Sequence, residues 1–427
     1  MLYYFVRPFA TLSFFLFFRK IYHKNIELVP KDKPILLASN HPSAFLEACL
    51  YACLLPQPLY FLTRGDVFKE GIINKILYSL NLIPIYRFRD GYANMKNNLA
   101  TFTICYKALR EKKTIIIFPE GRTKLIKRCD PAQKGAARIA FGAYEQYGDI
   151  DLQIVPIGVN YANGKKFRDD VMVQVGEPIA LRNYYDTFAK NENTAVKLLT
   201  QDLTVALKKN IIHIEHDEDT KLTEYVFTIF RHEQPYKILP IKVEDNFFLL
   251  SEKTLAEKIA VLSSDQKNDL LAKFNTYFGA LSKHKLSNYA FGKQNYFSFF
   301  GLITLIIGFI PFICGMISNF FPILCSKIIA DKKVTSVEFY APTLWAIWVL
   351  LSMLYSVVIL IISLCSFGLK FGVFIWLLLF FWGYFSLIYY DFFKRWWSGF
   401  KLWMLHKSDK TILYEKYQTV KSLVDNL

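Results

Sequence analysis

The sequence predicts an α/β domain with a mixed sheet flanked by helices, followed by a helical region and C-terminal transmembrane helices. From Pro34 to about Pro178, short apolar runs alternate with longer amphipathic stretches, as in layered α/β folds. Residues 183–290 are richer in Lys, Asp, Glu and Asn, and their apolar positions recur at helical spacing. Beyond residue 290, apolar runs become long enough to cross or enter a bilayer.

The chain begins with an apolar and aromatic stretch, MLYYFVRPFATLSFFLFFRK. Arg7 interrupts this stretch and no small-residue cleavage site follows it, which argues against a removable signal peptide. We therefore expect residues 1–24 to form a retained helix that lies on or in the membrane.

The α/β domain is expected over residues 25–182. Its predicted helices are Asn94 to Leu109 and Pro131 to Tyr147, the second opening on a proline, which a first helical turn accepts. Its predicted strands are apolar runs of strand length, mostly β-branched or aromatic. They are Pro34 to Ser39, Leu59 to Thr63, Thr114 to Phe118, Leu152 to Val159 and Val171 to Val175.

The membrane segments are expected within residues 291–400, at about 297–325, 341–366 and 371–393, before a cytoplasmic tail at 401–427. The first run contains Pro311 and Pro322, so a re-entrant hairpin and a full crossing are both open. Several lysines and arginines lie at each flank of the runs, except at the loop 367–370, which is short and nearly neutral. The positive-inside rule therefore predicts an integral membrane protein with that loop outside and the N-terminal domain on the cytoplasmic face.

Charge and composition narrow the class of protein. The 52 Lys and Arg against 36 Asp and Glu give a net charge of +16, which suits anionic partners. The 53% apolar content favours lipid, and no nucleic-acid recognition motif accompanies the basic stretches. A transporter would need ionisable residues inside its spans, and the runs have almost none before Asp391.

A histidine and a carboxylate follow the first predicted strand, in the segment NHPSAFLE. The neutral imidazole of His41 can remove a proton from an alcohol, and a carboxylate on its other nitrogen would fix the tautomer. Glu47 is the nearest candidate, although six residues of helix would turn it about 240° away. With Pro42 able to start a helix, the pair requires His41 to precede it. A structural pair, or Asp66 as the partner of His41, stays open.

The segment TIIIFPEGRT ends a strand at Phe118 and turns through Gly121 into a basic stretch. Backbone N–H groups after a glycine turn, together with guanidinium and ammonium groups, make a good phosphate site. A basic surface that faces acidic lipid is the alternative. The cations of this stretch are Arg122, Lys124, Lys127, Arg128, Lys134 and Arg138.

These two segments, with NLIPIYR between them and IVPIGVNY after them, follow the order of four sequence blocks in a known family. From about residue 20 to 180 the chain resembles the glycerolphosphate and lysophosphatidate acyltransferases. The chain is most similar to the branch that includes glycerol-3-phosphate and dihydroxyacetone-phosphate acyltransferases. That branch has FLD where this chain has FLE, and the C-terminal membrane runs fit it too. The arginine of the third block stands one position early, so Arg122 and Lys124 both remain candidates for the phosphate.

The resemblance implies His41 as the catalytic base, Glu47 as its acidic partner, and a set of residues that bind the substrate phosphate. That set is Arg87, Glu120, Gly121, Arg122, Lys124 and Lys134. The implied function is a membrane-bound O-acyltransferase of phospholipid biosynthesis. Its donor would be acyl-CoA or an acyl carrier protein, and its acceptor glycerol 3-phosphate, 1-acylglycerol 3-phosphate or another lysophospholipid. No metal, cofactor or nucleic acid is implied. A lipid-binding relative with weak or no activity, or a lysophospholipid-remodelling enzyme, is the alternative.

Overall fold

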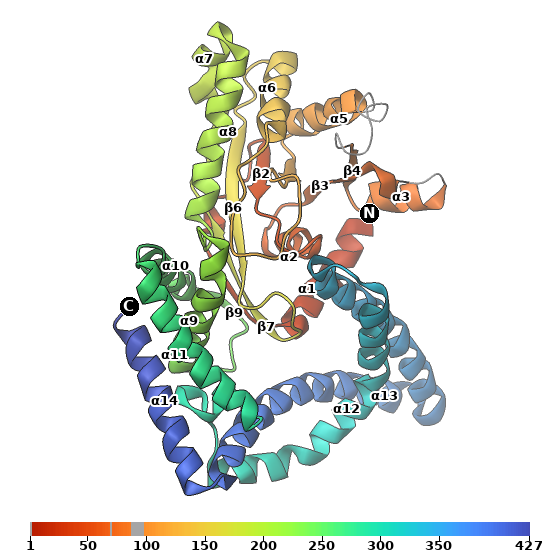
Figure 1. Ribbon diagram of the computed structural model, residues 1–427. Helices are drawn as coiled ribbons and strands as arrows, with labels where there is room; N and C mark the ends of the chain where they lie inside the picture. Colours follow the sequence, from red (N-terminus) through yellow and green to blue (C-terminus); the bar gives the residue numbers. More distant parts are fainter. Residues whose placement is uncertain (1, 69–70, 87–97) are drawn as a thin grey trace. The chain divides into compact units, whose positions relative to one another are not determined.

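The computed structural model describes residues 2–68, 71–86 and 98–427 (Figure 1). The chain divides into two compact units, which we describe in turn. Unit 1 comprises Met1–His213, Ile241–Leu249 and Thr335–Pro342. Unit 2 comprises Ile214–Pro240, Leu250–Val334 and Thr343–Leu427.

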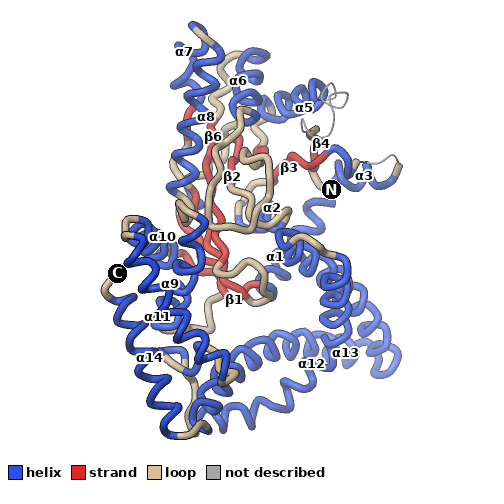
Figure 2. Tube along the Cα trace, in the orientation of Figure 1, coloured by secondary structure: helices blue, strands red, loops and turns tan. Residues whose placement is uncertain are grey.

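Unit 1 contains a mixed sheet that has nine strands in the described part of the chain (red in Figure 2). Its order is β4-β3-β5-β2-β6-β7-β1-β9, and β8 pairs with β6. Neighbouring strands are parallel except that β6 is antiparallel to β7 and β8. The strands are β1 (Phe18–Lys24), β2 (Ile35–Ser39), β3 (Leu59–Arg64), β4 (Leu82–Ile85), β5 (Thr114–Ile117), β6 (Gln153–Tyr161), β7 (Asp169–Val175), β8 (Ile179–Ala180) and β9 (Lys242–Glu244).

The predicted mixed sheet is confirmed, and the five predicted strands correspond to β2, β3, β5, β6 and β7. Every residue of β2 and β6 is buried, as expected for strands covered on both faces. The N-terminal helix is shorter than the expected 1–24. It ends at Phe17, because Phe18–Lys24 form the hydrogen-bonded ladder of β1 with β7 and β9.

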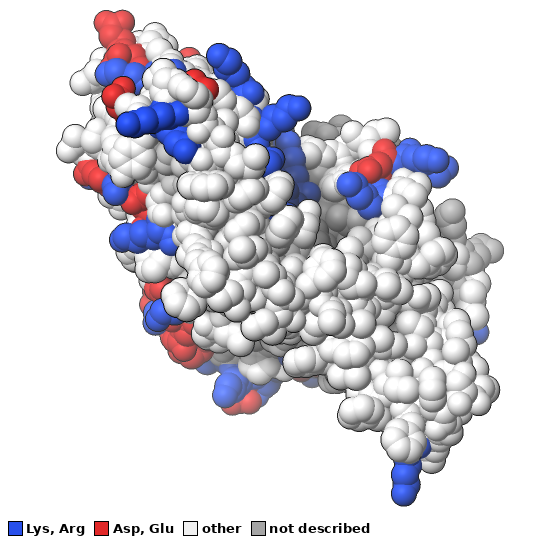
Figure 3. All heavy atoms as spheres, turned by 90° about the horizontal axis from the view of Figure 1, so that it is seen from below, with Lys and Arg blue, Asp and Glu red and all other residues white. Residues whose placement is uncertain are grey.

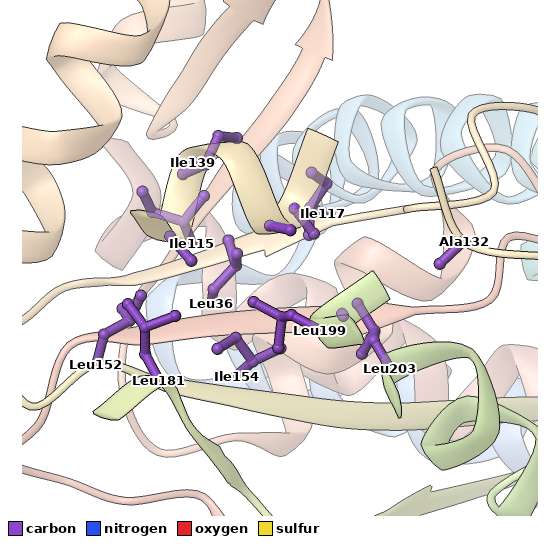
Figure 4. Packing of buried hydrophobic residues seen from close by; sticks show 14 of the residues in the cluster. Leu36, Ile115, Ile117, Ala132, Ile139, Leu152, Ile154, Leu181, Leu199 and Leu203 are labelled. Atoms are coloured by element: carbon purple, nitrogen blue, oxygen red, sulfur yellow. The ribbon is translucent and has the colours of Figure 1, made fainter. Parts of the chain in front are cut away.

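Helices pack on the sheet of unit 1. They are α1 (Leu2–Phe17), α2 (Leu46–Leu54), α3 (Ile72–Ser79), α5 (Asn98–Arg110), α6 (Gly135–Tyr147), α7 (Tyr185–Lys190) and α8 (Glu192–Lys209). In the main core, Leu36 and Ile115 of the sheet pack with Ile139 of α6, and Ile154 packs with Leu199 of α8 (Figure 4). This packing joins the central strands to two amphipathic helices.

Helix α6 begins at Gly135 rather than at the expected Pro131. The backbone N–H of Ala132 donates to Thr204 Oγ1 at 3.0 Å, and that of Gln133 donates to the Pro119 carbonyl at 2.7 Å. These bonds hold residues 132 and 133 in a loop that packs against α8 and the turn after β5. The predicted helix from Asn94 is described only from Asn98, since residues 94–97 lie outside the described part of the chain.

One side of α1 packs on unit 1, where the Tyr3 hydroxyl accepts a hydrogen bond from Leu59 N at 3.2 Å. The Arg7 guanidinium donates to the carbonyls of Leu55 and Pro56 after α2. Other side chains of the helix are exposed and apolar, namely Tyr4, Phe5, Phe9 and Leu12. An exposed apolar helix face of this kind suits a lipid surface.

The remaining helices are α9 (Thr220–Glu233), α10 (Phe247–Ala260), α11 (Ser264–Lys283), α12 (Phe299–Lys333), α13 (Val337–Met404) and α14 (Lys407–Asp425). Within unit 2, Arg231 of α9 binds the fully buried carboxylate of Glu252 with both Nε and Nη2, at 2.5 and 2.6 Å. Glu233 accepts from Tyr417 and pairs with Lys421 at 2.8 Å, which joins α9 to α14. The charged helices of unit 2 are thus held together by buried or half-buried ion pairs.

Two apolar helices of unit 2 are long enough to cross a membrane. Helix α12 continues through both Pro311 and Pro322. Helix α13 is interrupted at Gly368, whose φ of 70° and ψ of 178° are not helical. The Trp376 indole N–H donates to Ser356 O and Oγ at 3.1 and 2.9 Å, so the chain reverses at Gly368. The predicted runs 341–366 and 371–393 form the two arms of this hairpin.

A seam of glycines joins α12 to the second arm of α13. A Cβ on Gly315 would lie 2.1 Å from the Trp382 carbonyl oxygen, so only glycine permits this approach. The contacting pairs repeat every seven residues on both helices, as in packed membrane helices with small residues at the interface. The pairs are Gly301 with Trp396, Gly308 with Tyr389 and Gly315 with Trp382.

We expect Gly315→Leu to destabilise the chain by about 1–3 kcal/mol, because the added side chain must push the two helices apart. Thermal unfolding in detergent measures this effect. The matched control is Gly279→Leu on α11, where an added Cβ meets nothing within 4 Å. Equal melting midpoints for the two variants would contradict the close packing of α12 on α13 at Gly315.

Candidate active site

The residues that the sequence analysis singled out lie after the carboxyl ends of neighbouring parallel strands. β2 ends at Ser39 and leads to His41, while β5 ends at Ile117 and leads to Glu120. β2 and β5 are paired in parallel, so their carboxyl ends meet at one edge of the sheet. This edge is where open α/β sheets bind their ligands.

The turn between β2 and α2 is anchored to the next strand, β6. The Asn40 side chain donates to the Val159 carbonyl and accepts from the Val159 N–H, both at 2.9 Å. Helix α2 begins at Leu46, four residues after the proline that could have opened it. Residues 41–45 instead form an irregular turn, and His41 precedes the helix as the pairing with Glu47 requires.

His41 and Glu47 meet across this turn. His41 Nδ1 lies 2.7 Å from Glu47 Oε1, and the same oxygen accepts the Ser43 N–H at 3.1 Å. The Glu47 side chain is fully buried, whereas the His41 side chain is 11% exposed. Asp66, the competing candidate, is exposed and pairs with Arg64. The geometry therefore favours Glu47 as the partner of the imidazole.

The ring of His41 stacks on Phe118, with centroids 4.0 Å apart and planes inclined by 16°. With Nδ1 held by the Glu47 carboxylate, Nε2 has no hydrogen-bond partner among the described residues. A carboxylate on Nδ1 favours the tautomer with its proton there, which leaves a lone pair on Nε2. This arrangement can accept a proton from a bound hydroxyl.

Glu120 fastens the turn after β5 to the turn that carries His41. Its carboxylate accepts the backbone N–H groups of Asp130 and His41, and burial, followed by the charge of Asp130, raises the pKa of Glu120 to about 7. Lys124 N also donates to the His41 carbonyl at 3.3 Å. Gly121 closes the turn with a φ of 69°, a conformation that favours glycine. Glu120 thus faces backbone donors inside the domain.

The basic stretch after Gly121 contains both paired and unpaired cations. Arg122 donates to Asp130 at 2.6 Å and lowers the pKa of that carboxyl. Lys124 and Lys134 are exposed and form no ion pair with the described residues, and Lys134 stands at the N-terminal cap of α6. Arg87, which was also assigned to phosphate, lies outside the described residues.

Sequence reasoning missed two neighbours of the His–Glu pair. One is Phe118 as the stacking partner of the imidazole. The other is Tyr161, whose hydroxyl donates to Glu47 Oε2 at 3.5 Å. Tyr161 ends the IVPIGVNY segment on β6, and only the pairing of β6 with β2 brings it to the site.

Comparison with known proteins identifies a sequence family over the part of the chain that carries this pairing. Residues 20–160 match the family described as Acyltransferase. This part of the chain is an acyltransferase-family domain. The matched residues include the His41–Glu47 turn and the turn through Glu120 and Gly121.

Two yeast proteins and one bacterial protein are similar to this chain. "Glycerol-3-phosphate O-acyltransferase 1" of Saccharomyces cerevisiae is 26% identical over 332 residues, which cover 70% of this chain and 41% of the relative. "Glycerol-3-phosphate O-acyltransferase 2" of the same yeast is 30% identical over 163 residues, or 37% and 22% of the two chains. "1-acyl-sn-glycerol-3-phosphate acyltransferase" of Bacillus subtilis is 24% identical over 204 residues, or 47% and 89%. The matched regions cover less than half of each yeast relative, and the similarity to all three proteins is distant.

The raised pKa of Glu120 predicts a pH-dependent contribution to stability. Its folded-state pKa of about 7 lies above the ordinary value of 4.5, so the contribution is complete below pH 4.5 and is lost as the pH rises through 7. Glu120→Gln stays uncharged. We expect the free energy of unfolding of the wild type to fall relative to this variant by up to about 3 kcal/mol over that range. Melting midpoints in detergent at a series of pH values check this, and parallel curves would contradict it.

Proposed function

We propose that this protein is a membrane-bound enzyme that transfers an acyl group from an acyl thioester to a hydroxyl of glycerol 3-phosphate. 1-Acylglycerol 3-phosphate is the second acceptor that fits the same chemistry. The observation that carries the proposal is the 2.7 Å contact between His41 Nδ1 and the buried Glu47, beside a basic turn. The printed names of the two yeast relatives support glycerol 3-phosphate as the acceptor.

In the proposed reaction the acceptor hydroxyl hydrogen-bonds to His41 Nε2. His41 takes the proton as the hydroxyl oxygen attacks the thioester carbonyl, and Glu47 stabilises the imidazolium that forms. The tetrahedral intermediate then breaks its C–S bond, and the leaving thiolate takes the proton from the imidazolium. The products are an acyl ester and a free thiol, so no acyl group need be attached to the protein.

The basic turn supplies the proposed site for the acceptor phosphate. The exposed ammonium of Lys124 forms no ion pair with the residues that the structure describes, whereas Arg122 is already paired with Asp130. The backbone N–H of Lys124 donates to the carbonyl of His41. A phosphate held by Lys124 therefore stays close to the base. Lys134 at the start of α6, the backbone at Gly121, and Arg87 complete the proposed set.

The apolar helices support an integral membrane protein. Side chains of α12 and α13 such as Ile310, Leu354 and Phe381 are 59–74% exposed, and only 22% and 6% of the apolar stretches of the two helices are buried. Figure 3 shows a broad face almost free of Lys, Arg, Asp and Glu. A surface with so few charges and so many exposed apolar side chains suits lipid better than water. The exposed aromatic face of α1 suits the same membrane.

We further propose that the catalytic domain is cytoplasmic and that the reversal at Gly368 lies outside. In a cysteine-free background, Leu369→Cys is expected to react with an impermeant thiol reagent in intact cells. The matched site is Ser422→Cys on α14, which is expected to react only after permeabilisation. Reaction of Ser422→Cys alone in intact cells would reverse the proposed orientation.

The experiment that tests the function is product analysis by mass spectrometry with a panel of acceptors. Glycerol 3-phosphate, dihydroxyacetone phosphate, 1-acylglycerol 3-phosphate and a further lysophospholipid are each supplied with acyl-CoA or acyl carrier protein. We expect an acyl ester of glycerol 3-phosphate in largest amount. Acylation of the further lysophospholipid alone would indicate a remodelling enzyme. No ester from any pair would indicate a lipid-binding relative.

A further inference from the structure

The carboxylate of Glu47 is fully buried and uses both of its oxygens. Oε1 accepts hydrogen bonds from His41 Nδ1 at 2.7 Å and from the Ser43 N–H at 3.1 Å. Oε2 lies 3.5 Å from the hydroxyl of Tyr161, which comes from a strand 114 residues along the chain. A buried carboxylate held at only one oxygen can rotate about its Cγ–Cδ bond, since this torsion is broad. A donor at Oε2 restricts that rotation.

We propose that Tyr161 is a positioning residue for acyl transfer, acting through Glu47 on the tautomer and orientation of His41. This inference rests on the proposed function, in which His41 is the base. Tyr161 itself does not touch the reacting atoms. Its hydroxyl keeps Glu47 Oε1 directed at His41 Nδ1, so that the lone pair of Nε2 faces the acceptor hydroxyl.

The surroundings of Tyr161 hold its hydroxyl in place. The residue is paired with Val171 in the antiparallel β6–β7 ladder, and its ring is stacked with that of Phe18 at 6.1 Å and 19°. Its side chain is buried, with 5% of the residue exposed. Burial, and next the charge of Glu47, raise the pKa of Tyr161 well above its ordinary value, so the phenol remains a hydrogen-bond donor at neutral pH.

A second buried tyrosine provides the matched control. Tyr51 on α2 is 0% exposed, and its hydroxyl lies 2.8 Å from Ser39 Oγ rather than on the Glu47 carboxylate. Tyr161→Phe and Tyr51→Phe each remove one buried hydroxyl from the same domain. Both leave an aromatic ring of the same size, and melting midpoints report whether both variants remain folded.

The test measures kcat, both KM values and the pH dependence of kcat/KM for wild type, Tyr161→Phe and Tyr51→Phe. We expect Tyr161→Phe to lower kcat about 10-fold, as for loss of a hydrogen bond to a charged group, with little change in KM. The acidic limb of its pH profile is expected to move, because Tyr161 contacts the carboxylate that holds the catalytic imidazole. Tyr51→Phe is expected to keep the limb of the wild type.

A double variant separates positioning from a general loss of packing. Tyr161→Phe is expected to cause no further loss in a His41→Ala background, because its effect passes through His41. A wild-type kcat and pH profile for Tyr161→Phe, or the same loss with and without His41, would overturn the inference. If His41→Ala itself retains wild-type activity, the proposed function fails. If His41→Ala is inactive and Tyr161→Phe is normal, only the role of Tyr161 fails.

Discussion

Glu47→Gln is expected to lower kcat by about 10²- to 10⁴-fold while leaving both KM values close to those of the wild type. Glu47 is fully buried and its Oε1 accepts from His41 Nδ1 at 2.7 Å. An amide at this position can present its NH₂ group to Nδ1. The imidazole then carries its proton on Nε2, which removes the lone pair that the acceptor hydroxyl needs. Steady-state kinetics with glycerol 3-phosphate and an acyl thioester measure the loss.

Two further carboxylate variants serve as controls. Glu47→Asp keeps the charge but shortens the side chain by one methylene, so we expect an intermediate loss. Asp66→Asn removes the competing carboxylate, which is exposed and paired with Arg64, and is expected to keep near wild-type activity. A large loss in Asp66→Asn together with a small one in Glu47→Gln would transfer the role of partner to Asp66.

His41→Ala is expected to lower kcat by about 10²- to 10⁴-fold, the usual contribution of a general base. Phosphate binding should change little, since the basic turn is intact and its tie to position 41 is through the backbone. Removal of the imidazole also leaves the buried Glu47 without one of its donors, so some stability is lost as well. Melting curves separate unfolding from loss of the base. The exposed His406 provides the matched control, and His406→Ala is expected to keep full activity.

The central strands were predictable because their local sequences alone are typical of buried strands. Strands β2, β5 and β6 are buried along their whole length, so each is a short apolar run bounded by polar or turn residues. The apolar runs at 341–366 and 371–393 were predictable for a similar reason, since a helix long enough to cross a bilayer has a continuous apolar sequence. In each case the local composition reports the surroundings of the segment.

Elements that depend on distant partners were not predictable. Strand β1 has the mixed sequence FRKIYHK, and it forms only because β7 and β9 supply hydrogen bonds from segments far along the chain. The start of α6 is likewise decided by bonds from Ala132 and Gln133 to Thr204 and Pro119. The glycine seam of α12 became visible only when Trp382, Tyr389 and Trp396 were seen opposite it.

The candidate site shows the same division. The sequence pattern predicted His41 and Glu47 as a pair, but whether they meet depends on where α2 begins. The hydrogen bonds of Asn40 to Val159 on β6 help to fix the turn before that helix. Glu120 was grouped with phosphate-binding residues, whereas its carboxylate accepts backbone N–H groups inside the domain. Tyr161 reaches Glu47 from a strand 114 residues away, and no local pattern marks that contact.

The most direct measurement of the central claim follows acyl ester and free thiol in the same single-turnover reaction. Enzyme in excess is mixed with a labelled acyl thioester and glycerol 3-phosphate, and the two products are quantified together with any label on the protein. We predict that the wild type forms acylglycerol phosphate and thiol in equal amounts without labelled protein, and that His41→Ala forms both products about 10²- to 10⁴-fold more slowly. Equal rates of ester formation in the wild type and His41→Ala would contradict the account, as would a kinetically competent acyl-protein intermediate.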